Sequence, residues 1–195
     1  MEYLKRVVQE MVPVILGILI ALFINNWKEN RANERYVERA LTTISMEINE
    51  NLSSITDVLP RHYALMEDVM THLENDTLGI LEIVGRAGGV QSPTIKSAAW
   101  KFFLNSKSEL IDYEVASALV EMDEAKRVMD VKLEQFLSYS YEKMNATSSV
   151  DKQQFLIYFS NIVDSEETLQ ELYQTYLVKH TGVTFSTEEG EAPAK

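Results

Sequence analysis

An uncharged apolar run near the amino terminus constrains this chain more than any other feature. Residues 11–24 are 14 consecutive positions without a charged side chain, most of them aliphatic. At about 1.5 Å per residue the run covers about 21 Å, which is less than the hydrocarbon core of a bilayer. Extended to residues 7–27, it reaches 21 positions. That length is sufficient for a transmembrane helix.

Two other interpretations of the run fit less well. A cleaved export signal needs small residues at its cleavage site, whereas Asn25, Asn26 and Trp27 follow the run. A core helix of a soluble domain normally has a polar face, and residues 11–24 have none. Trp27 followed by Lys28 is typical of a membrane–water interface, so we take Trp27 as an interface anchor. We expect a short basic tail at 1–6 and an uncleaved transmembrane helix at 7–27.

Small and polar residues follow one stripe of this expected helix. The stripe has steps of 3, 4, 4 and 4 residues and consists of Glu10, Pro13, Gly17, Ala21 and Asn25. A small residue repeated after four positions lets two helices approach closely in a membrane, and polar groups can hydrogen-bond across the contact. The alternative is that Glu10 and Asn25 simply lie in the two headgroup regions. The stripe predicts a packing seam for a second copy or another membrane protein.

The segment "EMVPVILGILIALFINNWKENR", residues 10–31, resembles the opening of an uncharacterised family of small bacterial membrane proteins, classed as a domain of unknown function. The family segment is close to G-I-L-I-A-L-x-I-N-N-W-x-E-x-R, which residues 17–27, Glu29 and Arg31 match; Phe23 stands where a polar residue is expected. The later "AAWKFFLNSKSELIDYEVASALVEMDE" is also similar to the family. The resemblance implies a single-pass anchor with a helical domain, and it implies no activity.

The side of the membrane that carries the domain follows from the charges around residues 7–27. Lys5 and Arg6 precede the helix, while Lys28 and three arginines follow it, interleaved with glutamates. Basic residues near a span favour the cytoplasm, but large domains are translocated largely regardless of charge. A basic tail before an apolar run is also how an export signal begins. We expect a bacterial inner-membrane protein, and we favour a periplasmic over a cytoplasmic position for its domain.

The remaining chain has the patterns of an all-α domain at 28–183. An apolar stripe of helical period runs from Val37 to Leu59, so we expect one helix to continue from the membrane as far as Pro60. Four further helices are expected, as an antiparallel bundle: 61–74, one starting at Ser92-Pro93, 112–144 after Asp112 as N-cap, and 152–180 with an interruption near Asp164 and an end at Gly182. Residues 184–195 have the composition of a disordered acidic tail.

Composition and motifs limit the chemistry. The net charge of −12 argues against binding to nucleic acid, and the chain has no Cys. No nucleotide-binding glycine loop, nucleophile turn or zinc-protease motif occurs. His62, Met66 and Met70 share a helical face, which favours core packing over a metal site. The aromatics from Trp100 to Phe159 favour a core over a ligand cavity, and acid pairs such as Glu121 with Glu124 favour a solvated surface. We predict neither an enzyme nor a cofactor.

Two functions remain open. The first is a scaffold protein that assembles through its transmembrane helix and holds a partner with its helical domain. The second is a ligand-sensing bundle that acts through a separate signalling partner. Only about six residues precede the expected span, which leaves no output domain there and favours the scaffold.

Overall fold

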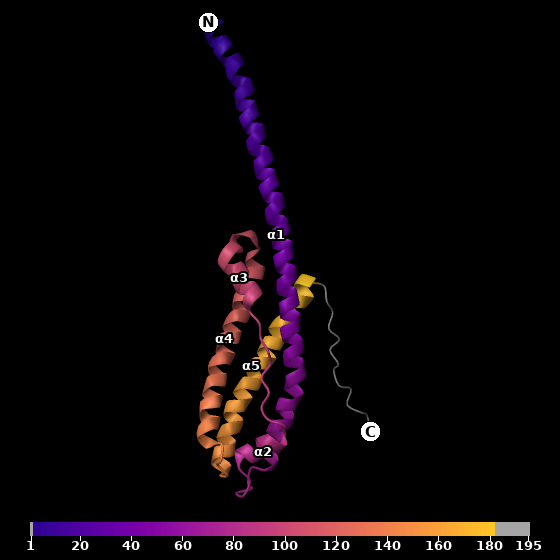
Figure 1. The fold of residues 1–195 in the computed structure, drawn as a ribbon, viewed down its shortest axis with the longest axis vertical. Helices are drawn as coiled ribbons and strands as arrows, with labels where there is room; N and C mark the ends of the chain where they lie inside the picture. The colour runs from indigo at the N-terminus through magenta and orange to yellow at the C-terminus, as the bar shows by residue number, and fades with distance from the viewer. Residues whose placement is uncertain (1, 182–195) are drawn as a thin grey trace, which may run out of the picture. The chain divides into compact units, whose positions relative to one another are not determined.

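The computed structural model describes the backbone of residues 2–181 and the side chains of residues 11–181, and all regular structure in this range is helical. The all-α class and the long apolar helix at the amino terminus are therefore confirmed. The elements are α1 (Glu2–Thr71), α2 (Ile80–Arg86), α3 (Ala98–Lys107), the 3-10 turn η1 (Ser108–Leu110), α4 (Tyr113–Lys143) and α5 (Ser149–Thr181) (Figure 1). The chain divides into two units, residues 1–42 and 43–195, which we describe separately.

The first unit consists of the amino-terminal part of α1. Every side chain from residue 11 to residue 32 is exposed. Strong helix formers such as Glu, Arg and Ala occupy many positions after residue 28, so the helix continues there on intrinsic propensity rather than on a core. This unit buries no apolar face of its own within the described residues.

The second unit, called the helical unit below, is built on the rest of α1. Apolar side chains of α1 recur at helical spacing and are buried: Ile44, Ile48, Leu52, Ile55, Val58, Leu59, Leu65 and Val69. Such a stripe turns one face of the helix into the core. The residues from Ile44 to Leu59 are the stripe that the sequence predicted.

α4 and α5 pack along each other in the helical unit (Figure 1). They are joined by a short connection at residues 144–148. Between them, Phe136 lies 5.2 Å from Phe155 and 5.3 Å from Phe159, measured between ring centroids. Tilted aromatic pairs at these distances add specific attraction to the burial of apolar area.

Pro60 does not end the first helix, so the predicted boundary is wrong. A proline inside a helix costs about 3 kcal/mol because it removes a backbone donor and crowds the preceding turn. α1 nevertheless continues to Thr71. Ile55 and Leu59 are buried before Pro60, and Leu65 and Val69 after it. Burial of a single apolar side chain contributes about 1.5–3 kcal/mol, so packing on both sides outweighs the penalty.

The expected helix start at Ser92-Pro93 is also wrong, because α3 begins at Ala98. Residues 89–97, called the strap below, have no regular secondary structure instead. Asn51 donates to the Lys96 carbonyl over 2.7 Å and accepts from the Lys96 amide over 2.8 Å, while Ser54 accepts from the amide of Thr94. Side chains of α1 thus satisfy the strap backbone groups that a helix would have satisfied internally.

The short helix α2 closes one end of the helical unit. α2 begins where the amides of Ile80 and Leu81 donate to carbonyls of Ala146 and Met144. After α2, Gly88 and Gly89 both have positive φ, a conformation that favours glycine and leads the chain into the strap. This α2 includes Gly85 and Arg86.

The last two long helices match the sequence with two changes. Asp112 holds the N-cap position of α4 as predicted, although its side chain makes no capping hydrogen bond. α5 begins at Ser149 rather than 152, and it is not interrupted near Asp164. Ser148 starts it: its hydroxyl accepts from the Asp151 amide and donates to the Asp151 carboxylate. Gly182 and the predicted tail at 184–195 lie outside the described residues.

Candidate functional site

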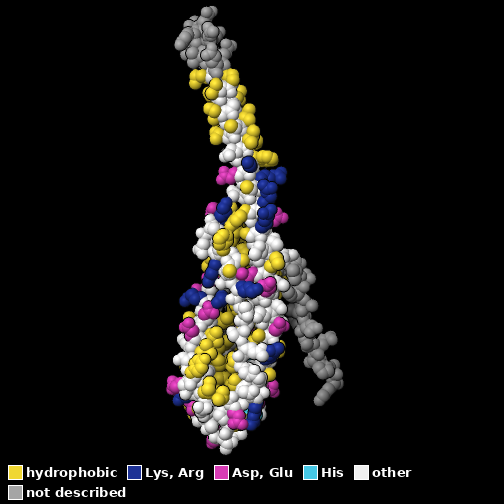
Figure 2. All heavy atoms as spheres, in the orientation of Figure 1, with side chains coloured by type: hydrophobic (Ala, Val, Ile, Leu, Met, Phe, Trp, Pro, Cys, Tyr) yellow, Lys and Arg dark blue, Asp and Glu magenta, His cyan; other side chains and the backbone are white. Residues whose placement is uncertain are grey.

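The amino-terminal apolar segment is the feature of the molecule most suited to contact something outside the chain. Figure 2 shows it as a band of apolar side chains that charged side chains follow. It is the one stretch in the described residues that is long and apolar enough to cross a membrane, and none of it is buried. Its large exposed residues are Met11, Val12, Val14, Ile15, Leu16, Ile18, Leu19, Ile20, Leu22, Phe23, Ile24 and Trp27. Water is a poor solvent for such a surface.

The stripe predicted as a packing seam lies within this segment. Pro13, Gly17, Ala21 and Asn25 are all on α1 and exposed, whereas the side chain of Glu10 lies outside the described residues. A Cβ atom built on Gly17 would meet nothing within 4 Å, so the backbone is open there. Steps of four residues follow the i±4 ridge of a helix, the geometry of right-handed crossings of the small-xxx-small kind. The stripe remains a prediction.

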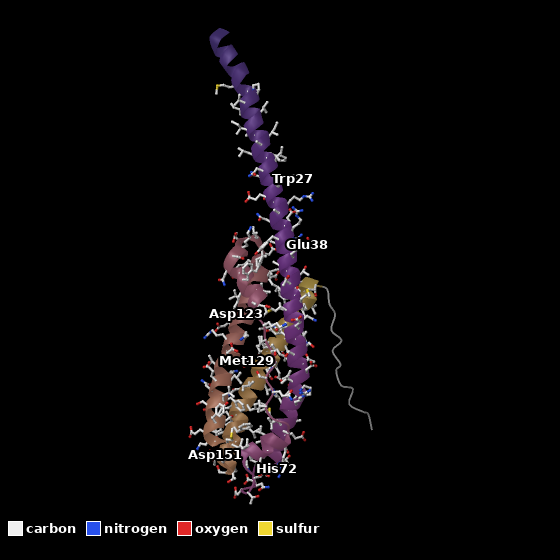
Figure 3. The ribbon with its side chains drawn as sticks, viewed as in Figure 1. Trp27, Glu38, His72, Asp123, Met129 and Asp151 are labelled. Carbon is white, nitrogen blue, oxygen red and sulfur yellow. The ribbon has the colours of Figure 1, made fainter. Side chains whose placement is uncertain are left out.

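A polar boundary begins at Trp27. The Arg31 guanidinium lies 5.5 Å from the centroid of the Trp27 ring, within the range of a cation–π contact. Arg35 donates from Nε to the carbonyl of Arg31 over 3.2 Å. Figure 3 labels Trp27 between the apolar side chains and the first charged ones. An amphipathic ring followed by cations is what the edge of a bilayer favours.

A buried ionisable pair crosses the core of the helical unit. His62 on α1 and Glu166 on α5 are 2% and 0% exposed. The Nδ1 atom of His62 lies 2.8 Å from Oε2 of Glu166, and its Nε2 atom lies 2.6 Å from the carbonyl oxygen of Gln91 in the strap. The pair therefore connects three segments that are distant in the sequence.

The hydrogen-bond partners of His62 indicate its protonation state. Both ring nitrogens face oxygen acceptors, so both must carry hydrogen for the two bonds to form. Burial alone would lower the pKa of His62, but the hydrogen bond and charge of Glu166, with the Gln91 carbonyl, raise that pKa above its ordinary value of 6.5. The geometry and the raised pKa both favour the charged form of His62 in a structural role.

This geometry bears on the alternative that His62, Met66 and Met70 hold a metal. Both nitrogens of His62 are engaged, and Met70 is 62% exposed. Among residues that the structure describes, no group of three or more His, Asp or Glu is placed to hold a metal ion. His62 is thus held in the core by two hydrogen bonds, while Met70 lies at the surface.

The aromatic side chains divide between core and surface. Trp100, Phe103, Phe136, Phe155 and Phe159 are buried, as the core interpretation requires. Phe102 is 69% exposed, and Tyr139 pairs with Tyr158 at 5.0 Å between ring centroids. Of the acid pairs that the sequence contains, Glu124 accepts two hydrogen bonds from Arg127 at 2.5 and 2.9 Å. That contact is an exposed helix-surface ion pair.

Sequence reasoning missed most of the buried polar residues. Glu166, Lys152 and Asn51 are fully buried, yet each stands in a sequence context typical of a helix surface. Nζ of Lys152 donates to the carbonyls of His72 and Asn75, over 2.9 and 2.6 Å. Figure 3 labels His72 and Asp151 at this end of the helical unit. The burial of Glu166, Lys152 and Asn51 is explained only by their hydrogen-bond partners, which are far away in the sequence.

Comparisons with protein-family models, with curated proteins and with solved structures gave no match. The resemblance to a family of bacterial single-pass membrane proteins therefore stays a prediction, and the function must be argued from the molecule itself.

Proposed function

We propose that the chain is a single-pass protein of the bacterial inner membrane that serves as a scaffold. One observation carries this proposal: from Met11 to Trp27 no side chain is charged and every side chain is exposed. Two turns of such a surface would already be unfavourable in water, and the lipid bilayer is the partner that can cover all sides of the helix at once. Residues 7–27 are the proposed span.

The helical unit is the part that we propose to hold a partner. Its core forms without the apolar segment, because α1 from residue 43, α2, α3, α4 and α5 supply buried side chains to one another. Short connections between long helices favour antiparallel packing, so we propose an antiparallel bundle. An acidic surface, with net charge −12 over the chain, suits a basic protein partner better than nucleic acid.

Assembly through the membrane is the proposed mechanism. Gly17 and Ala21 lack bulk on the face that includes Pro13 and Asn25, so a second helix can approach the backbone closely there. The partner helix belongs to a second copy or to another membrane protein. Neither a catalytic step nor a cofactor is part of this proposal.

The assembly is tested on the full chain extracted in mild detergent, by measuring its mass and its co-purifying proteins. The Gly17→Leu/Ala21→Leu variant fills the seam, and Val14→Phe/Ile18→Phe adds bulk with the same spacing on another face. We expect a defined oligomer or complex in the wild type and in the control variant, and its loss in the seam variant. A monomer without partners in all three would refute the scaffold.

The side of the membrane is tested separately. We propose that the helical unit lies in the periplasm. Because the chain has no Cys, a single Cys introduced at the exposed Met46 reports its own location. A membrane-impermeant maleimide should label Met46→Cys in spheroplasts without lysis. Labelling only after lysis would place the helical unit in the cytoplasm.

A second candidate function is ligand sensing by the helical unit through a separate signalling protein. An apolar cavity between α2 and α4 favours it, since a core that were filled throughout would leave no room for a ligand.

A further inference from the structure

An apolar cavity of about 200 Å³ opens at the surface of the helical unit. It lies between α2, the strap and the junction of α4 with α5. The lining residues are Ile80, Leu81, Val84, Val90, Phe136 and Leu137, together with Ser140, Tyr141, Met144 and Phe155. None of these side chains carries a charge.

The cavity has a buried floor and an exposed mouth. Ile80, Phe136 and Phe155 are at most 2% exposed and form the floor. Leu81, Val90, Leu137 and Tyr141 lie around the mouth and are between 37% and 74% exposed. Four large apolar side chains held at the surface around one opening are costly in water unless something covers them. The mouth therefore favours entry of an apolar molecule.

Ser140 supplies the one hydroxyl in this lining that is buried. Its Oγ atom is buried and has no hydrogen-bond partner among the described residues. Helix hydroxyls elsewhere in the helical unit, such as those of Thr56, Thr71 and Thr168, donate to the carbonyl four residues earlier. Ser140 makes no such bond. A buried polar group without a partner is costly, and a ligand that supplies the partner recovers that cost.

We infer that this cavity is a binding site for a small neutral molecule with an apolar body and one hydroxyl or carbonyl group. The apolar body contacts Phe136, Phe155 and Leu137, and the polar group hydrogen-bonds to the hydroxyl of Ser140. An apolar cavity of about 150 Å³ is enough for benzene, so this larger one takes about eight to ten non-hydrogen atoms. A medium-chain alcohol has the required size and polarity. A charged headgroup has no counter-ion in the lining.

The site is tested on the full chain in lipid nanodiscs with a photoreactive diazirine analogue of octanol. Labelled peptides are identified by mass spectrometry over a range of probe concentrations, with octanol and octane as competitors. We expect saturable labelling within residues 80–84 and 137–144, displaced by octanol at lower concentration than by octane. Labelling of residues 11–27 from the bilayer should rise in proportion to the probe and not saturate. Labelling of the helical unit that never saturates would overturn the inference.

Two variants locate the contacts, with one matched control. Ser140→Ala should weaken displacement by octanol about five-fold, the loss of one hydrogen bond, and leave octane unchanged. Ser138→Ala, an exposed serine on the same helix, should behave as the wild type. Leu81→Trp fills the mouth and should abolish saturable labelling while circular dichroism stays constant. Equal displacement by octanol in Ser140→Ala and in the wild type would overturn the assigned role of Ser140.

The outcome is independent of the proposed scaffold. Seam variants that lose assembly but keep saturable labelling would support both proposals. If the wild type forms an intact oligomer but shows no saturable labelling, the ligand site is refuted and the scaffold proposal is unaffected.

Discussion

The amino-terminal and carboxyl-terminal parts of α1 contain similar apolar residues, but these residues are exposed in the first part and buried in the second. In residues 11–27 the aliphatic side chains cover most of the helix circumference and stay exposed, whereas from Ile44 to Val69 they follow one face and are buried. Both parts are helical throughout. The comparison teaches that hydrophobic content alone does not determine burial. Arrangement around the helix does, because a stripe can be covered by neighbouring helices and a full cylinder needs an apolar solvent.

The two parts also differ in how they treat polar groups. In the helical unit, buried polar side chains such as His62 and Asn51 have defined partners. Residues 11–27 have no charged side chain at all. A charge introduced in residues 11–27 should therefore affect membrane insertion, whereas a charge at an exposed position of the helical unit should not.

The largest effect is expected from charges placed within the apolar segment. Leu16→Arg/Leu19→Arg should abolish membrane insertion, because each Arg near the centre of a span costs about 3 kcal/mol. Carbonate extraction should move the protein from the membrane to the soluble fraction. Met46→Arg, at an exposed position of α1 in the helical unit, should leave the protein in the membrane. If the double variant is still retained, the segment is not a transmembrane helix.

The next largest effect is expected from the buried pair. His62→Ala should lower the free energy of unfolding by about 3–5 kcal/mol, because it leaves the Glu166 carboxylate buried without its partner. Tyr63→Phe removes the neighbouring hydrogen bond to Glu167, which is exposed, and should cost less than about 1 kcal/mol. Denaturation with urea, followed by circular dichroism, measures both. Equal effects would mean that burial does not strengthen the pair.

The same pair predicts a pH dependence of stability. The pKa of His62 is raised in the folded protein above 6.5, its ordinary value. Its contribution is therefore fully present below about pH 6.5 and is lost as the pH rises through the folded pKa. The difference in free energy of unfolding between wild type and His62→Gln should shrink as the pH rises above 6.5. Curves that stay parallel between pH 5 and pH 9 would contradict a charged His62 in the folded state.

The smallest effect is expected at the start of α5. Ser148→Ala removes both hydrogen bonds with Asp151 and should lower the free energy of unfolding by about 1 kcal/mol. Ser138→Ala, on the exposed face of α4, should change it by less than about 0.5 kcal/mol. Thermal unfolding of the two variants against the wild type provides the measurement. A larger loss for Ser138→Ala would contradict the capping role.

Features encoded by local pattern were predicted well from the sequence. The apolar segment, the buried stripe of α1 and the Asp112 start of α4 follow from composition, period and capping preference within a few residues. Pro60 and the strap were predicted wrongly because local signals there lose to contacts that are distant in the sequence. Leu65 and Val69 keep α1 helical beyond the proline, and Asn51 and Ser54 bind the backbone of Lys96 and Thr94 outside any helix.

The candidate sites also divide into one that a local sequence pattern predicts and one that depends on contacts distant in the sequence. Gly17 and Ala21 are recognisable because their spacing is a property of one helix. Ser140 and its cavity are not, since the lining comes from α2, the strap, α4 and α5, and a serine inside a helix normally satisfies its hydroxyl locally. Only the positions of the surrounding side chains distinguish Ser140 from Ser138.

Lys152 links the end of α1 to the start of α5 and so couples the local unfolding of these two helix ends. α1 has no basic residue in its last turn, and Nζ of Lys152, in the first turn of α5, donates to the carbonyls of His72 and Asn75 just beyond that turn. The end of one helix is thus stabilised by the beginning of another that is about 80 positions away in the chain. Amide hydrogens near residue 72 and those near the start of α5 should consequently exchange with deuterium together, as a single cooperative opening, although ends of independent helices would fray separately.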